Sequence, residues 1–549
     1  MNDRVRRVAI DGLSSECIDL ASRWLRECLA SHQGCNQGVE AGSSSFPKRL
    51  VDVGNEDRPP RLVIPPAGSS GQYVALSHCW GGRQPLTTKT STLAERQNAI
   101  PLPTMPLTFQ HAVHVTRRLG FRYLWIDSLC IIQDSTSDWE EQAGQMQHVY
   151  EGAVVTIAAD AGGDSSCGLS STDKRRLFGG TRIPGQNLIV APGPESGETP
   201  AHFPRAFVNG GELDKLRNDG SLLQTRGWTF QERVLAPRVL HYGEHELAWE
   251  CASAIACECR AARSGMGRRA AHETTYKAEW STQTGNGASL EFSRRWMALV
   301  AKYSSRALTY SADKLPALAG LASRVARSSS CTYLAGHWKE DLGRTLLWTA
   351  GSLPLIDGGR RHADYHAPSW SWASLHGAQI FGHIDPECEV TLTIKEASCT
   401  PRHSRNPFGA VADGRLEIDC AMAPVTVAEV RDVAAAGYSL HGFRIRPESI
   451  KLMKTVVVDG ALGHPSLQAD TRSEPTYPDV SEFDEFDLGD TYTFLEVARA
   501  RGISRGLIVR HSRRVPGAYE RVGVHETPVG VMTREDGTSR HQVSTVLLV

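Results

Sequence analysis

An aromatic ring and a carboxylate stand four residues apart in the segment 226–233, which reads Arg-Gly-Trp-Thr-Phe-Gln-Glu-Arg. Residues four apart on a helix share a face, so Trp228 and Glu232 would place a flat ring beside an acid. This pair suits a reaction in which a flat aromatic group leaves and a positive charge develops. The same pair suits a structural arrangement, in which Trp228 belongs to the core and Glu232 forms an ion pair with Arg226 or Arg233. The local sequence leaves both interpretations open.

Strand and helix signals alternate over residues 71–260, and these elements must position the pair. We predict four buried strands, at residues 73–77, 123–127, 154–159 and 238–242. Helices opening near Thr108 and Asp138 separate the first three strands, and Glu141 is interpreted as the capping-box partner of Asp138. Such alternation predicts a parallel, doubly wound α/β sheet, in which ligands bind outside the carboxyl ends of the strands. The Gly-rich loop after residue 77, Asp127 and the helix carrying Glu232 would then converge on one cleft.

The rest of the chain divides around this zone. Residues 1–70 hold one amphipathic helix and turn-rich sequence, and we interpret them as an N-terminal helical leader. Residues 261–290 are small, polar and aperiodic, which predicts a linker or surface loop. Residues 291–549 begin with helical periodicity and continue as short strand-like runs separated by turn residues, which predicts a helical and then β-rich C-terminal region.

Composition narrows the class of protein. The chain has 549 residues and a formal net charge of -1, so it has no general attraction to nucleic acid or anionic lipid. It lacks a run of about 18 apolar residues that would span a membrane, and its first residues lack the apolar stretch of a secretory signal. Thirteen cysteines, an odd number at scattered positions, are typical of reduced thiols inside a cell. We therefore expect a cytoplasmic protein.

Two groups of cysteines are candidates for binding a metal ion. Cys28, His32 and Cys35 have tolerable ligand spacing, but no fourth ligand is evident nearby in the sequence. Three more cysteines follow at positions 251, 257 and 259, without a paired C-x-x-C motif. Buried free thiols are the simpler interpretation, with zinc as the alternative, and we assign no metal site.

His78 beside Cys79 also invites comparison with a Cys–His hydrolase. Adjacent residues of a strand point to opposite faces, which is poor geometry for a nucleophile and its base. Cys130 could replace Cys79 in such a pair. We keep this as a minor alternative.

Four segments in order resemble the heterokaryon-incompatibility (HET) domain of fungal proteins: 73–81, 122–134, 138–159 and 226–250. Four later segments resemble regions that follow this domain in many such proteins: 307–310, 313–318, 333–336 and 367–374. The resemblance covers nearly the whole chain. It implies a part in self/non-self recognition that ends in regulated cell death.

The HET domain is in turn similar to the TIR domain, a flavodoxin-like fold found in NAD-cleaving immune enzymes. In that comparison the first three predicted strands match TIR strands, and the TIR pattern of Trp with Glu four residues on falls on Trp228 and Glu232. Two features differ. Residues 160–225 stand where a TIR domain has a short loop, and Gln142 occupies a position that is Glu in many members.

Cleavage of the bond between ribose and nicotinamide passes through an oxocarbenium-like state, which a preorganised carboxylate can stabilise. We predict Glu232 as the catalytic residue and Trp228 as the ring that stacks on nicotinamide. Glycines in the loop 79–82 would let its amides approach a pyrophosphate. The predicted nucleotide-binding residues are Ser77, His78, Trp80, Gly81, Asp127 and Trp228.

Two functions from different classes remain open. The first is an NAD-consuming effector enzyme (an NAD glycohydrolase) that acts when clustered as a homo-oligomer and needs no prosthetic group. The second is a non-catalytic recognition or signalling module of the same fold, whose C-terminal region binds a protein partner. If the protein is such an enzyme, we expect the C-terminal region to pack on or near the cleft and keep the isolated chain inactive.

Overall fold

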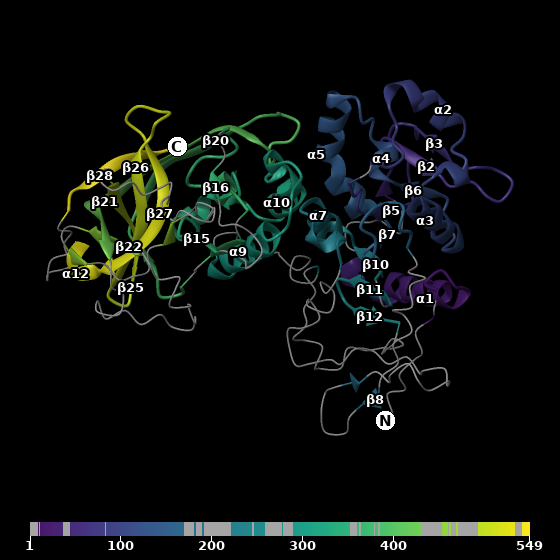
Figure 1. Ribbon diagram of the computed structural model, residues 1–549, viewed down its shortest axis with the longest axis horizontal. Coiled ribbons are helices and arrows are strands. Elements are labelled where there is room, and N and C mark those ends of the chain that lie inside the picture. The colour runs from purple at the N-terminus through teal and green to yellow at the C-terminus, as the bar shows by residue number, and fades with distance from the viewer. Residues whose placement is uncertain are drawn as a thin grey trace, which may run out of the picture. The chain divides into compact units, whose positions relative to one another are not determined.

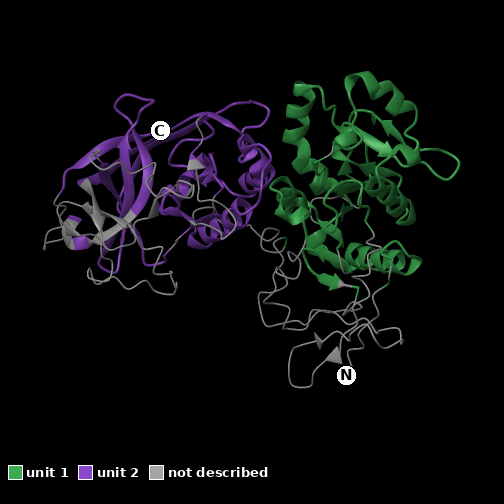
Figure 2. Ribbon diagram, in the orientation of Figure 1, with its two compact units in different colours: residues 1–284 green, residues 285–549 purple. Residues whose placement is uncertain are grey.

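The computed structural model forms two compact units, residues 1–284 and residues 285–549 (Figure 2). It describes residues 9, 11–36, 44–82, 84–169, 181–182, 189–190, 221–243, 246–258, 277, 289–351, 360–361, 364–377, 379–382, 385–430, 453–458, 461–462, 468–469, 492–532 and 541–549. The predicted linker at 261–290 therefore lies outside the described residues except at positions 277, 289 and 290. None of the described helices combines the length and apolar character that a membrane crossing requires.

Four parallel strands form the centre of the sheet in the first unit, as the sequence predicted (Figure 1). In spatial order they are β10 (Arg238–Tyr242), β7 (Val155–Ala158), β5 (Val74–Ser77) and β6 (Tyr123–Trp125). All three neighbouring pairs run parallel. When they are numbered by their order in the sequence, these strands lie in the order 4-3-1-2 across the sheet. Because they run parallel, the carboxyl ends of β5, β6 and β7 lie along the same side of the sheet.

The sheet is not wholly parallel, which corrects the predicted fold. On one side β11 (Leu247–Cys251) and β12 (Ile255–Cys257) continue from β10 as antiparallel strands. On the other side β2 (Leu50–Asp52) and β3 (Arg61–Val63) extend β6, also antiparallel. The connections from β10 to β11 and from β11 to β12 are too short for a crossover helix, and short connections allow only antiparallel pairing. Residues 1–70 thus supply sheet strands as well as a helix.

Helices α1 (Ser15–Ser31), α3 (Leu107–Arg118), α5 (Thr136–Gly152) and α7 (Trp228–Leu235) accompany the sheet. The hydroxyl of Ser135 caps α5 by accepting from the backbone amide of Asp138, so Asp138 is not the cap that the sequence suggested. The shorter elements of this unit are η1 (Gln33–Cys35), β1 (Ser44–Ser45), β4 (Ser70–Gly71), η3 (Thr90–Thr92), α2 (Leu93–Asn98), η4 (Leu102–Thr104), α4 (Asp127–Cys130), β8 (Thr181–Arg182), β9 (Ile189–Val190) and η6 (Leu223–Thr225).

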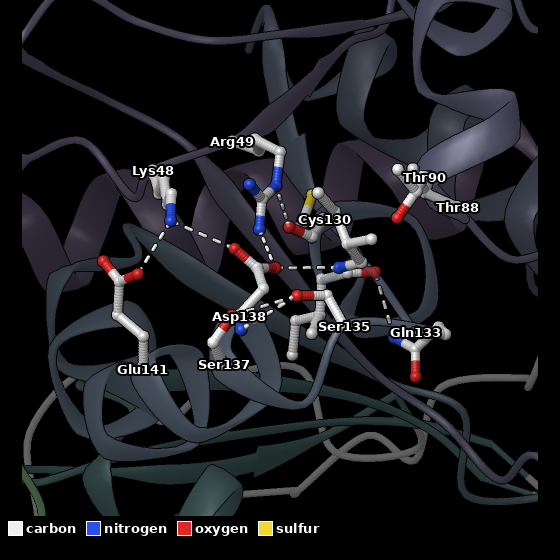
Figure 3. Close-up of polar contacts among 12 residues, drawn as sticks. Lys48, Arg49, Thr88, Thr90, Cys130, Gln133, Ser135, Ser137, Asp138 and Glu141 are labelled. Carbon is white, nitrogen blue, oxygen red and sulfur yellow. Dashed lines mark hydrogen bonds and ion pairs between the residues drawn. The ribbon is translucent and has the colours of Figure 1, made fainter.

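Asp138 instead anchors the start of α5 to the segment that leads into β2 (Figure 3). Its carboxylate accepts hydrogen bonds from Arg49 and from the backbone amide of Ile132, and it lies 3.0 Å from the Lys48 ammonium. Lys48 also pairs with Glu141 at 2.8 Å, so Glu141 is an ion-pair partner and not a capping-box residue. The Asp138 pKa is lowered because these donors outweigh the burial of its carboxyl.

The second unit begins with two helices, α9 (Leu290–Ser304) and α10 (Pro316–Ser328), beside a core of fully buried tryptophans. These rings are Trp296, Trp338, Trp348, Trp370 and Trp372. The guanidinium of Arg521 is buried with them, 3.5 Å from the centre of the Trp348 ring, and it donates to the carbonyls of Leu346 and Trp348. The Trp-rich segment at 367–374 therefore serves packing.

The β-rich region predicted for the C-terminal part is confirmed. Strands β25 (Tyr492–Ala500), β26 (Ile503–His511), β27 (Tyr519–Pro528), β28 (Val543–Leu548) and β21 (Val411–Val430) pair in a ring, because β21 also pairs with β25. The remaining elements are η8 (Ser311–Asp313), β13 (Tyr333–Leu334), β14 (His337–Trp338), η9 (Lys339–Asp341), α11 (Leu342–Thr345), β15 (Trp348–Gly351), β16 (Arg360–Arg361), η10 (Trp372–Ser374), β17 (Leu375–His376), β18 (Gln379–Gly382), β19 (Glu389–Val390), β20 (Thr393–Pro401), β22 (Met453–Val458), β23 (Ala461–Leu462), β24 (Gln468–Ala469) and α12 (Val529–Met532).

Candidate active site

The carboxyl group of Glu232 lies at the end of the first parallel strand. Ser77, the last residue of β5, donates its hydroxyl hydrogen to the Glu232 carboxylate. Both residues are buried, with 4% of Ser77 and 6% of Glu232 exposed. The hydroxyl of Tyr150, from the last turns of α5, donates to the backbone carbonyl of Leu76 at 3.3 Å and lies close enough to Glu232 to affect its pKa. Residues from two helices and a strand, far apart in the sequence, thus meet at this carboxyl.

Burial sets the charge of this group. The Glu232 pKa is raised from the ordinary 4.5 to about 7, chiefly by burial and in smaller part by the negative charge of Asp127. The hydrogen bond from Ser77, the nearby Tyr150 hydroxyl and the positive charge of Arg226 act in the opposite direction. A carboxyl whose pKa lies near 7 exchanges a proton readily at neutral pH, as acid–base groups in active sites do.

Asp127 lies beside this group, at the start of the short helix that follows β6. One of its carboxylate oxygens accepts from the Trp80 indole at 2.7 Å, and the other accepts from the Ser128 backbone amide at 2.7 Å. The carboxylate is about a quarter exposed. Asp127 therefore holds the ring of Trp80 in place and adds negative charge beside Glu232.

His78 also faces Asp127, with 3.8 Å between its Nδ1 atom and a carboxylate oxygen. Burial lowers the His78 pKa, and the charge of Asp127 only partly offsets this effect. The Nε2 atom is buried and has no hydrogen-bond partner among the described residues. Its ring packs edge-on against Phe109 of α3, with 5.0 Å between the centroids. His78 is thus a neutral imidazole whose buried Nε2 atom has no hydrogen-bond partner among the described residues.

Trp228 opens helix α7, one turn before Glu232. Its half-buried ring meets the Trp139 ring of α5 edge-on, with centroids 6.5 Å apart. An open hollow of about 310 Å³ adjoins Trp139 and is lined by Gln133, Asp134, Ser135 and Thr136 as well. This hollow lies on the Trp139 side of the pair of rings, and Glu232 does not line it.

The loop after β5 turns at Gly81, which has a φ of +71°, a conformation that residues with a side chain rarely adopt. A Cβ atom at this position would lie 2.3 Å from the Cβ of Asp164. The space beside Gly81 is therefore filled by the loop at Asp164. The neighbouring Gly82 faces open space.

A second buried polar network lies at the ends of β7 and β10, and the sequence analysis missed it. His241 of β10 lies between two carboxylates, 2.6 Å from Asp160 and 3.1 Å from Glu250. Arg233 pairs with Glu250 at 2.8 Å, so its ion-pair partner is Glu250 and not Glu232. The charges of His241 and Arg233 and hydrogen bonds from the His241 and Gln224 side chains hold the Asp160 pKa low despite burial. Asp160 directly follows the predicted strand 154–159, and Asp127 is the last residue of the predicted strand 123–127, so the position at the end of a strand was the available signal.

Neither cysteine of the hydrolase alternative has the surroundings of a nucleophile. Cys79 packs in an apolar cluster with Ala158 and Val239, and burial raises its pKa. Burial also raises the Cys130 pKa, to about 12. Nucleophilic cysteines need a lowered pKa, so this structure does not support Cys–His chemistry.

The site brings together Ser77, His78, Trp80, Asp127 and Glu232 at the carboxyl ends of β5 and β6, next to Tyr150. Comparison with known families places the same residues inside one domain. Residues 73–232 match the model of the family described as heterokaryon incompatibility protein (HET), and the chain therefore carries a heterokaryon-incompatibility domain there. That range begins one residue before β5 and ends at Glu232. No curated protein and no solved structure matches the chain.

Proposed function

We propose that this protein is a cytoplasmic effector of heterokaryon incompatibility and regulated cell death, and that it acts by cleaving NAD between ribose and nicotinamide. The heterokaryon-incompatibility domain at residues 73–232 supports the biological role. The surroundings of Glu232 support the chemistry.

The order of the parallel strands supports a TIR-like fold for this domain. Read across the sheet from β6, the parallel strands lie in the order β6-β5-β7-β10. When each strand is numbered by its order in the sequence, this reads 2-1-3-4, the order with which flavodoxin-like sheets begin. Such sheets bind ligands outside the carboxyl ends of their strands, at the point where the strand order reverses. In this sheet that point lies between β5 and β7. Ser77 and the loop after it occupy that edge, and Glu232 is bonded to Ser77.

The observation that carries the proposal is the Glu232 carboxyl itself, which is buried at this edge with a pKa of about 7. In its ionised form it would stabilise the positive charge that develops on the ribose as nicotinamide leaves. Ser77 would hold the carboxylate in one orientation, and Trp228 would stack on the leaving ring. Because the ionised form is needed, the rate should rise with pH through about 7.

A recognition module without catalysis is the second candidate. It is favoured by the 6% exposure of Glu232, whose carboxylate is already bonded to Ser77 in the isolated chain. On the enzymatic proposal, the start of α7 must move to admit NAD, and clustering of several chains would provide that movement. The two candidates therefore differ in whether a concentrated protein consumes NAD.

The test is nicotinamide release by the purified full-length protein over a range of protein concentrations. We expect activity that rises more than proportionally with protein concentration. Glu232→Gln keeps the size and the hydrogen bonding but removes the charge, and it should lower the rate about 10²–10³-fold. Glu141→Gln is the matched control, because Glu141 pairs with Lys48 away from Ser77, and its activity should stay near that of the unmodified protein. An active, well-folded Glu232→Gln protein would refute the role of Glu232, and absence of NAD loss at every concentration would favour the recognition module.

A further inference from the structure

Helix α1 lies beside strand β11, next to the edge strand β12 (Figure 1). Four side chains that can ligate a metal ion meet there. Cys28 is in the last turn of α1, His32 follows its end, and Cys35 closes the short helix η1. Cys251 is the last residue of β11, more than 200 residues further along the chain. One ligand atom from each of the four lies within 4.8 Å of the others.

The spacing of these atoms fits a tetrahedral zinc ion. With bonds of about 2.3 Å to sulfur and about 2.0–2.1 Å to nitrogen, tetrahedral geometry puts two sulfurs about 3.8 Å apart and a sulfur and a nitrogen about 3.6 Å apart. The Sγ atom of Cys251 lies 3.4 Å from Nδ1 of His32. Small side-chain movements therefore suffice to close the set around one ion. Three cysteines and one histidine are a common ligand set of structural zinc sites.

The charge around the cluster gives a second, independent indication. Zinc with three thiolates and a neutral imidazole carries a net charge of −1, which a buried site must balance. Arg238 is only 3% exposed, and its Nε atom donates to Sγ of Cys28 at 3.2 Å. Its other described partners are the carbonyls of Val154 and Cys35 and the amide oxygen of Asn36, none of which carries a charge. A thiolate at Cys28 would give this buried cation an anionic partner.

We propose that Cys28, His32, Cys35 and Cys251 bind a structural zinc ion that fastens α1 to strand β11. All four ligands come from the protein, so the ion has no open position for a substrate. Successive residues of a strand point to opposite faces, so Cys251 faces α1 while its neighbour Glu250 faces Arg233 of α7. The metal would thereby hold the strand that carries one carboxylate of the network around His241.

A disulfide is the competing state of these thiols. It would join two of the three cysteines and leave the third thiol beside His32. A disulfide that includes Cys28 would also leave Arg238 without an anionic partner. Reduced cysteines and bound zinc can be distinguished from a disulfide by mass and by metal content, so the experiment measures both.

The experiment uses the full-length protein, prepared without added metal or metal-affinity tag, and measures its metal content by elemental mass spectrometry. We expect about one zinc ion per chain. Cys251→Ser should lower the zinc content at least tenfold after dialysis against a chelator. Cys17→Ser is the matched control, because Cys17 is a buried cysteine of the same helix that lies outside the cluster, and this variant should keep its zinc.

His32→Cys guards against the case in which Cys251→Ser fails to fold. It preserves four ligands and removes the imidazole, so it should retain zinc, while its cobalt(II)-substituted form should show stronger sulfur-to-metal charge-transfer absorption than the unmodified protein. A metal-free protein whose thiols are all titratable would overturn the proposal. So would a disulfide between two of Cys28, Cys35 and Cys251, detected as a mass two hydrogens lower than the reduced chain and located by peptide mapping, or zinc retained equally by Cys251→Ser and Cys17→Ser.

Discussion

Replacing Glu232 by Gln should stabilise the folded protein at high pH while it lowers the rate of NAD cleavage about 10²–10³-fold. The Glu232 pKa rises from 4.5 to about 7 on folding, chiefly because the carboxyl is buried. Each unit of pKa is worth about 1.4 kcal/mol, so keeping this carboxylate ionised costs the folded state about 3 kcal/mol. The amide group that replaces the carboxylate would fill the same space without charge, and its oxygen can still accept the hydrogen bond from Ser77.

The sign of the pH dependence follows from the proton count. Between pH 4.5 and about 7 the folded chain holds a proton on Glu232 that the unfolded chain has released. The stability of the unmodified protein therefore falls as pH rises through this window, by the contribution of this group. The Glu232→Gln variant lacks that contribution. Below pH 4.5 the two proteins should be about equally stable, and above pH 7 the variant should be more stable by about 3 kcal/mol.

The assay is thermal unfolding of both proteins, followed by tryptophan fluorescence at closely spaced pH values from about 4 to about 8. For a unit of this size about 3 kcal/mol corresponds to roughly 6 °C in Tm. Taking the difference between the two proteins removes the titration of other groups, apart from Asp127 and Tyr150, which interact with Glu232 directly. Glu141→Gln should show a small difference that does not change across this range. The assignment of a raised pKa would be refuted if the difference in stability between Glu232→Gln and the unmodified protein did not change with pH. It would also be refuted if the variant lost stability relative to the unmodified protein as pH rises.

Three further outcomes test other parts of the structure. Asp138→Asn leaves the buried Arg49 without its charged partner and should lower the free energy of unfolding by about 3–5 kcal/mol in chemical denaturation; a loss under about 1 kcal/mol would contradict the anchoring role. Gly81→Ala forces a positive φ and a contact with Asp164, so it should lower Tm and disturb the loop after β5, whereas Gly82→Ala, which faces open space, should be tolerated. A fragment of residues 1–284 should consume NAD faster than the whole chain at equal concentration if the second unit restrains the first; equal rates would exclude that restraint.

The central strands were predictable because they are short, buried on both faces and mostly apolar, although β10 also carries Arg238 and His241, and such runs are visible in the sequence. β5, β6, β7 and β10 fall within the predicted ranges, and their parallel pairing follows from the connections between them. The outer strands β2 and β3 were missed because they have only three residues each, too few to show a period. The cap of α5 was misplaced because Ser135 and Asp138 are both good caps by type, and only the contact of Asp138 with Arg49 distinguishes them.

Local sequence alone determined which side chains were available for chemistry, because residue type and spacing are properties of the chain. It indicated Ser77, Asp127 and Glu232 as groups at the carboxyl ends of strands and on the following helix. Tertiary structure alone decided their partners. Ser77 meets Glu232 across 155 positions of sequence, and Arg233 turns to Glu250 although Glu232 is its neighbour.

The cysteine cluster shows most clearly that the tertiary structure decides which side chains meet. The sequence offered Cys28, His32 and Cys35 together at the end of one helix, and no fourth ligand beside them. The fourth, Cys251, lies more than 200 residues further along the chain and is brought to them by the antiparallel return of β11 along β10. Spacing along the chain reports only local geometry, whereas a closed metal site depends on where distant segments pack, and that is decided by the whole fold.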